Sequence, residues 1–180
     1  MDAPRSLLRD EDHTIGPETA AAVLVEYGDY ECPFCRRDQP GLERLLGQEG
    51  DQVRFAFRHF PIVAEHPNAE RAARTAEAAD LQGRFWPMHE QLMHWAGPLE
   101  DDALAACAEA AGLSPDRLWA DVERPEVTKR IERDIELGRS DGVGGTPWYL
   151  LDGARAGPLA AIAKELRSEP DQADGGRSPR

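Results

Sequence analysis

The chain has 180 residues, of which 41% are hydrophobic and 31% are charged, and this balance excludes an intrinsically disordered protein. Its 34 acidic residues outnumber its 21 lysines and arginines, and the formal charge of −13 argues against a nucleic-acid partner. The longest stretch without a charged side chain, Gly142–Leu151, has about half of the roughly 20 residues that a membrane helix requires. We therefore expect a folded domain with no membrane span.

The two ends of the sequence are polar, and we expect residues 1–12 and 168–180 to be flexible termini. Met1–Asp12 has no apolar segment and no small-residue cleavage site of the kind that marks a secretory signal. The sequence as written therefore predicts a cytoplasmic protein, whereas a processed form would belong outside the cytoplasm.

The N-terminal part predicts a strand–helix–strand unit. Val23–Tyr27 is a short β-branched run that ends at a glycine turn, which is typical of a buried strand. Pro33 suits the first turn of a helix, and leucines at helical spacing continue that helix to about residue 47. Val53–Phe60 begins with alternating apolar and polar residues and predicts a second strand, while His13–Ile15 predicts a short edge strand.

The sequence from Pro67 to Gly138 is rich in alanine and predicts helices. The separable segments are Asn68–Gln82, Phe85–Trp95, Glu100–Ala111 and Arg117–Leu137, the last of which is broken near Pro125. A strand at Trp148–Leu151 then leads into a hairpin turn at Asp152-Gly153, and Gly157–Leu166 predicts a closing helix.

This order of elements indicates an α/β fold. A βαβ unit that is followed by a β-hairpin and a helix is the thioredoxin topology, and the helical block sits where an insertion would lie. We therefore predict a thioredoxin-like fold with an inserted all-helical subdomain. We assign residues 13–66 and 139–167 to the thioredoxin-like domain and residues 67–138 to the helical insertion.

Two of the three cysteines, Cys32 and Cys35, form a C-x-x-C motif between the first buried strand and its helix. Thiol–disulfide exchange needs a thiolate, which the free amides and the dipole of a helix N-terminus stabilise. It also needs a second thiol within one helical turn. The motif meets both needs, with Cys32 as the exposed nucleophile and Cys35 as the more buried resolving thiol.

Two further features accompany the cysteines. Glu26 ends an apolar strand six residues before Cys32, where a buried carboxyl could relay a proton to or from Cys35. The alternative is a strand-end acid that points to solvent. Thr146-Pro147 precedes the last predicted long strand, where a cis peptide bond would leave the Thr146 backbone free for a substrate strand. The alternative is a trans proline in a glycine-rich turn.

In this combination and order, the features resemble the DsbA-like thiol–disulfide oxidoreductases. The matching stretches are Val25–Cys35, Arg58–Pro67, Gln82–His89, Ser140–Pro147 and Asp152-Gly153, within a resemblance that covers about residues 13–167. The resemblance implies a thioredoxin fold, Cys32 as nucleophile, Cys35 as resolving thiol, Glu26 as buried acid and Pro147 as cis-proline. It also implies protein or small-thiol disulfide substrates and a redox partner of unknown identity, and we assign Phe34, Thr146 and Pro147 to substrate binding.

The dipeptide between the cysteines departs from the Pro-His of the strongly oxidising periplasmic members. Phe34 gives the thiolate no cationic or hydrogen-bonding partner, so we expect a Cys32 pKa in the upper part of the range of roughly 3.5–7.5 for activated thiols. We accordingly expect a reduction potential between the thioredoxin and strong-oxidant extremes of roughly −270 and −120 mV.

We expect no metal and no organic cofactor, because the cysteine pair itself carries the electrons. A zinc site would need Cys107 and a histidine, and no second C-x-x-C or H-x-x-x-H is present. We interpret Cys107 as a buried small hydrophobe and His59 and His66 as packing or surface groups. Met88, His89, Met93 and His94 resemble a soft-metal box, but residues five positions apart do not share a helix face. An ordinary core stripe accounts for this helix instead, made by Phe85, Trp86, Met88, Leu92 and Trp95.

Two other function classes stay open on the sequence. One is a non-catalytic peptide-binding or chaperone-like module that uses the Thr146-Pro147 edge with an idle or metal-loaded C-x-x-C motif. The other is a glutathione-dependent transferase or isomerase on the same fold. The retained cysteine pair argues against the second class, because such enzymes need no resolving thiol.

Overall fold

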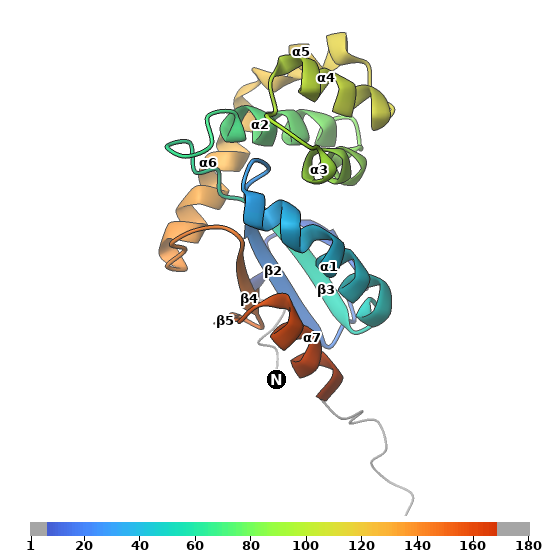
Figure 1. Ribbon diagram of the computed structural model, residues 1–180, viewed down its shortest axis with the longest axis vertical. Helices are drawn as coiled ribbons and strands as arrows, with labels where there is room; N and C mark the ends of the chain where they lie inside the picture. The colour runs from blue at the N-terminus through green and yellow to red at the C-terminus, as the bar shows by residue number, and fades with distance from the viewer. Residues whose placement is uncertain (1–6, 169–180) are drawn as a thin grey trace, which may run out of the picture.

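A five-stranded mixed sheet lies at the centre of the protein (Figure 1). In the computed structural model, which describes residues 7–168, the strand order is β1-β3-β2-β4-β5. The strands are β1 (His13–Ile15), β2 (Ala22–Gly28), β3 (Val53–His59), β4 (Trp148–Leu151) and β5 (Ala154–Arg155). Strands β2 and β3 are parallel, and the other neighbouring pairs are antiparallel. The predicted strands and the thioredoxin-like fold are confirmed.

Seven helices complete the part of the chain that the structure describes. They are α1 (Pro33–Glu49), α2 (Ala69–Asp80), α3 (Phe85–His94), α4 (Asp101–Ala110), α5 (Pro115–Val122), α6 (Pro125–Ser140) and α7 (Leu159–Ser168). The segment predicted at Arg117–Leu137 is two helices, and the expected break at Pro125 is confirmed. Both helices begin with proline, whose fixed φ and missing N–H suit a first turn.

The two faces of the sheet are covered by different elements, because successive strand residues point to opposite sides. Helices α1 and α7 pack on the face that carries Leu24, through a core cluster that includes Leu42 and Ile162. Helix α6 packs on the opposite face, beside Tyr27. A Cβ atom at Gly138 of α6 would lie 2.6 Å from the Phe60 ring, so a glycine there permits the close approach of this helix.

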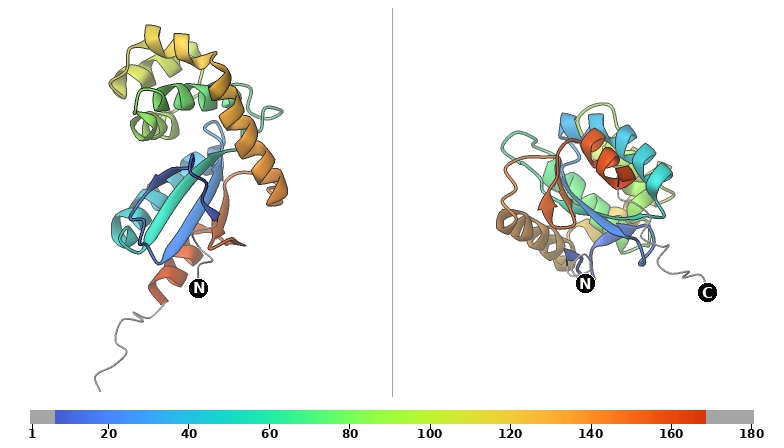
Figure 2. Two further views of the ribbon diagram at one scale, coloured as in Figure 1. Left: turned by 180° about the vertical axis from the view of Figure 1, so that it is seen from behind. Right: turned by 90° about the horizontal axis from the view of Figure 1, so that it is seen from below.

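Helices α2 to α5 and the start of α6 form a lobe beyond one end of the sheet (Figures 1 and 2). This lobe does not have a separate core, because Phe85 and Met88 of α3 belong to the same buried cluster as Phe57 of β3. The ring centroids of Phe57 and Phe85 lie 6.4 Å apart. The insertion is therefore packed directly on the sheet.

The segment before β1 differs from the flexible terminus that we expected. Arg58 donates a hydrogen bond to the carboxylate of Asp12 at 2.7 Å and another to the carbonyl oxygen of Leu7 at 2.6 Å. The Asp12 side chain is fully buried in this ion pair. Residues 1–6 and 169–180 lie outside the described residues, and Ser168 is the last residue of α7.

No helix in residues 7–168 combines the length and the apolar character that crossing a membrane requires.

Candidate active site

The turn after β2 places both cysteines of the motif at the start of α1. Cys32 is the N-cap residue, and its N–H donates to the carbonyl oxygen of Asp29 at 3.1 Å. Both cysteines are free thiols, and they are only 2% and 1% exposed. Our prediction of an exposed Cys32 is therefore wrong for this dithiol form. The loop before β4 lies against Cys32, whose sulfur donates to the carbonyl oxygen of Thr146 at 3.2 Å.

The pKa of Cys32 is lowered to about 5. The largest cause is a hydrogen bond from the Cys35 thiol, which stabilises the Cys32 thiolate, while burial opposes it. The Thr146 side chain and the backbone N–H groups of Cys35 and Phe34 lower the pKa further. The pKa of Cys32 lies below the upper part of the range that we expected. The Phe34 side chain donates no hydrogen bond to the thiolate, but the second thiol and the amides of the first turn do.

The second thiol and the predicted acid are both buried beneath Cys32. Burial raises the pKa of Cys35 well above its usual value, and the hydrogen bond to Cys32 and the charge of Glu26 raise it further. Glu26 is 1% exposed, so the alternative of a solvent-facing acid does not hold. Burial and then the charges of Asp38 and Cys32 raise the pKa of Glu26 to about 8, and its Oε2 atom has no hydrogen-bond partner among the described residues.

The Thr146–Pro147 peptide bond is cis, and it lies beside a groove with a volume of about 310 Å³. The groove is lined by Phe34, Arg37, Asp38, Thr146, Pro147, Trp148, Tyr149, Arg155, Ala156, Gly157 and Pro158. All three predicted substrate-binding residues therefore border one groove. Two polar atoms there, Thr146 Oγ1 and Trp148 Nε1, are buried without a partner in the part of the chain that the structure describes.

Two arginines that sequence reasoning missed border the same groove. The Arg155 guanidinium lies 3.6 Å from the centroid of the Trp148 ring, and the Arg37 guanidinium lies 5.0 Å from that of Phe34. Cation–π contacts of this kind hold a charge over an aromatic face. The groove thus carries two arginines and aromatic rings together with one acid, Asp38, which pairs with Arg37 at 3.0 Å.

Hydrogen bonds also join the residues that flank the cysteines to the helical insertion. The Glu31 carboxylate accepts from the backbone N–H groups of Asn68 and Leu99, each at 2.8 Å. Arg36 donates to the carbonyl oxygen of Tyr30 at 2.6 Å and to that of Gly97 at 2.8 Å. No sequence motif indicated the anchors to Asn68, Leu99 and Gly97, because each pairs a side chain with a backbone group of a distant loop.

The remaining sequence predictions fall outside this site. Cys107 is a buried residue in the core, as predicted, and burial raises its pKa to about 11. His89 is buried and lies 3.0 Å from the Tyr30 hydroxyl, whereas His94 is exposed and lies 2.7 Å from Glu43. His66 lies 2.8 Å from the buried Asp29 carboxylate.

Residues 23–167 match the family model of the DSBA-like thioredoxin domain. The chain is 36% identical over 177 residues to the Na(+)/H(+) antiporter NhaA 3 of Salinispora tropica, covering 94% of this chain. It is 38% identical over 146 residues to the Na(+)/H(+) antiporter NhaA 1 of Salinispora arenicola, covering 81% of this chain. The chain spans only 27% and 22% of the lengths of these two relatives.

Solved structures give the same fold. A thioredoxin-like oxidoreductase from Silicibacter pomeroyi superposes with a TM-score of 0.80 at 28% identity, covering 91% of this chain and 95% of that one. The catalytic domain of ScsC from Proteus mirabilis superposes with a TM-score of 0.77 at 22% identity, covering 92% and 95% of the two chains.

Proposed function

The chain belongs to the family of DSBA-like thioredoxin domains, and from this premise we propose that it exchanges disulfides with protein or small-thiol substrates through Cys32 and Cys35. One observation carries the proposal. Cys32 has a pKa of about 5 at the N-terminus of α1, and a buried second thiol lies within one turn of it. At neutral pH the first sulfur is therefore a thiolate, which is the attacking species in disulfide exchange.

The reaction proceeds in two exchange steps. The Cys32 thiolate attacks one sulfur of a substrate disulfide, forms a mixed disulfide and releases the other substrate sulfur as a thiolate. Cys35 then loses its proton and attacks the Cys32 sulfur, which releases the second substrate thiolate and leaves a Cys32–Cys35 disulfide. Two electrons pass from the dithiol to the substrate, and the reverse sequence oxidises a substrate dithiol.

Glu26 serves as the proton acceptor for Cys35 in the second step and as the donor in the reverse direction. Its pKa of about 8 keeps both the protonated and the ionised carboxyl accessible near neutral pH, which suits a proton relay. The exchange needs no metal and no organic cofactor, because the cysteine pair holds both electrons.

The groove beside Thr146 and Pro147 holds the substrate next to Cys32. The Thr146 N–H donates no hydrogen bond within residues 7–168, so an extended substrate segment can pair with this backbone edge. Asp38 pairs with Arg37 at 3.0 Å, whereas Arg155 stacks on Trp148 at the same groove and favours substrates with acidic side chains close to the disulfide.

Three proteins test this function: the wild type, Cys32→Ser and Cys35→Ser. We expect the wild type to reduce insulin and to oxidise a dithiol peptide, and Cys32→Ser to do neither. We expect Cys35→Ser to accumulate a mixed disulfide on Cys32, which mass spectrometry of the intact protein detects. A wild type inactive in both directions, with peptide binding that survives Cys32→Ser, would instead support a non-catalytic binding module.

A further inference from the structure

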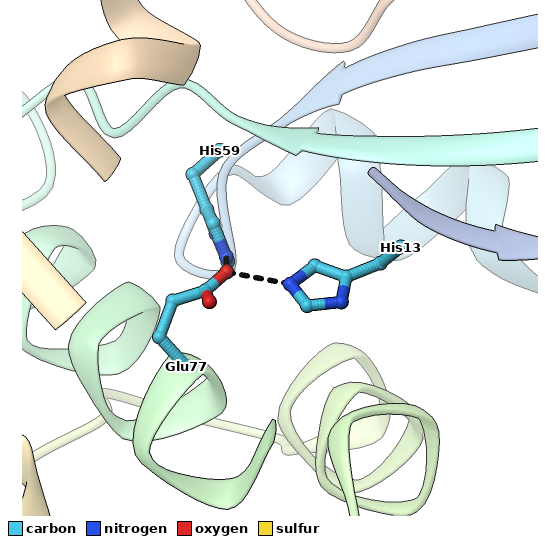
Figure 3. Close-up of side chains that lie close together, drawn as sticks. All are labelled: His13, His59 and Glu77. Carbon is cyan, nitrogen blue, oxygen red and sulfur yellow. Dashed lines mark hydrogen bonds and ion pairs between the residues drawn. The ribbon is translucent and has the colours of Figure 1, made fainter. Parts of the chain in front are cut away.

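Three side chains from distant parts of the chain meet between the sheet and the helical lobe (Figure 3). His13 comes from β1, His59 from the end of β3, and Glu77 from α2. The Nε2 atoms of both histidines lie 2.7 Å from the same atom, Oε1 of Glu77. All three side chains are buried. Two imidazole nitrogens and one carboxylate oxygen are therefore directed at a single point.

This donor set is one that zinc uses in proteins, in the combination of two histidines and one glutamate. The three ligand atoms all lie within 4.8 Å of one another, close enough for a single ion to contact each of them. No local motif indicated the cluster, because Glu77 is 64 positions from His13 and 18 from His59.

A second carboxylate lies behind one of the histidines. Oδ1 of Asp80 is 3.7 Å from Nδ1 of His13, on the side of the ring opposite Glu77. A carboxylate at this distance favours a proton on Nδ1 electrostatically once a metal ion has displaced the Nε2 proton. Metal-binding histidines commonly have such a partner.

A cavity of about 350 Å³ gives access to the cluster, since both His13 and Glu77 line it. The other lining residues are Asp10, Glu11, Asp12, Asp80, Leu81, Glu126, Val127 and Arg130. Acidic side chains thus predominate around the opening, and such a field raises the local concentration of cations.

We propose that His13, His59 and Glu77 bind a divalent transition-metal ion, with zinc as the best fit and a cavity water as the fourth ligand. An ion bonded at about 2.0–2.1 Å to each atom holds neighbouring ligand atoms roughly 3.3 Å apart, so each hydrogen-bonded pair opens by about 0.6 Å. The ion replaces the protons of these hydrogen bonds and fastens β1, β3 and α2 together. This proposal departs from our sequence-based expectation that the chain holds no metal, and the proposed site is separate from the cysteine chemistry.

Zinc binding to the oxidised protein tests the proposal, because the Cys32–Cys35 disulfide removes that thiolate pair from competition. We expect one equivalent of zinc to remain after dialysis and to raise the melting temperature, which a chelator then lowers. We expect Co²⁺ at the same site to give a spectrum of nitrogen and oxygen ligands without a thiolate charge-transfer band. Oxidised wild type that retains no zinc, or a Co²⁺ spectrum with thiolate character, overturns the proposal.

Variants then locate the ion. We expect Asp80→Asn, which changes one exposed atom, to weaken zinc binding roughly tenfold. We expect Glu77→Gln to abolish it. Asp102→Asn, an exposed charge on α4, is the matched control and should bind zinc as the wild type does. An unchanged zinc affinity in both Asp80→Asn and Glu77→Gln contradicts the proposed ligands. If Glu77→Gln fails to fold, the zinc stoichiometry and the Co²⁺ spectrum of the wild type still decide whether the site binds a metal.

Discussion

The sulfur of Cys32 lies 3.2 Å from the carbonyl oxygen of Thr146, although 114 positions separate these residues in the sequence. The contact brings the start of α1 against the loop that leads into β4. Thr146 therefore belongs both to the surroundings of the nucleophilic sulfur and to the edge of the groove. Under the proposed function, a substrate segment that pairs with this loop would present its disulfide directly to Cys32.

Removal of the Thr146 hydroxyl should weaken the thiolate at Cys32. The Thr146 hydroxyl has no hydrogen-bond partner among residues 7–168 of the dithiol form, and it is among the groups that lower the pKa of Cys32, because it can donate to the sulfur once the thiol ionises. We therefore expect Thr146→Val to raise the pKa of Cys32 by about one pH unit, which is about 1.4 kcal/mol. The ultraviolet absorbance of the thiolate, followed against pH, measures the change. Thr146→Ser keeps a hydroxyl and is the control. An equal pKa in the valine and serine variants would show that the hydroxyl has no such role.

Glu26→Gln should change both stability and the pH profile of exchange. The folded-state pKa of Glu26, about 8, lies above its ordinary value of 4.5, so the protonated carboxyl favours the folded dithiol form at low pH and this contribution is lost as pH rises. Between these two values, the wild type should lose stability relative to Glu26→Gln by about 1.4 kcal/mol per pH unit. Urea unfolding of the reduced proteins across this range measures the difference.

The same variant should slow the step in which Cys35 attacks the mixed disulfide, because the proton acceptor is gone. Stopped-flow decay of a preformed mixed disulfide isolates this step. A decay rate in Glu26→Gln equal to that of the wild type at every pH would exclude Glu26 from the proton relay.

Arg155 should select acidic substrates. We expect Arg155→Gln to raise KM by roughly threefold to fivefold for a disulfide peptide with a glutamate beside the cysteine, because an exposed ion pair contributes up to about 1 kcal/mol. The kcat should change little, since Arg155 does not contact the sulfur atoms. Lys164→Gln removes an equal charge from the exposed side of α7 and serves as the control. A lysine peptide affected as strongly as the glutamate peptide would contradict this preference.

Asp12→Asn should destabilise the fold through the buried pair with Arg58. Burial raises the pKa of Asp12, but the hydrogen bond and charge of Arg58 hold the pKa below its usual value. The carboxylate therefore contributes stability above its ordinary value of 3.8, and this contribution is lost as pH falls. We expect the free energy of unfolding of Asp12→Asn to be about 3 kcal/mol below that of the wild type at neutral pH, as measured by urea unfolding, and the difference to be smaller in acid. Asp10→Asn, an exposed neighbour, should unfold as the wild type does.

The fold and the cysteine motif could be predicted from the sequence because their signals are local. Alternation in Val53–Phe60, proline at the start of α1 and the break at Pro125 each report on backbone preferences within a few residues. The burial of Glu26 could also be predicted from the sequence, because the other residues of its strand are mostly apolar and that strand is expected to be buried.

The contacts between distant segments could not be predicted in this way. The prediction that Cys32 is exposed was wrong because a loop more than a hundred positions away in the sequence covers its sulfur atom. The meeting of His13 with Glu77 depends on where α2 lies relative to β1, which no single segment encodes. Arg155 could not be predicted as a groove residue for the same reason, because only its tertiary contact with the Trp148 ring places it there.

The side chains of Glu31 and Arg36 tie the first turn of α1 to the loops around Asn68 and Gly97. Both residues directly flank the Cys32–Cys35 segment, so these hydrogen bonds join the segment that carries the thiols to the helical insertion. A substitution that removes either side chain should therefore lower the protection of the first-turn amides of α1 against hydrogen exchange, although it lies outside the cysteine motif itself.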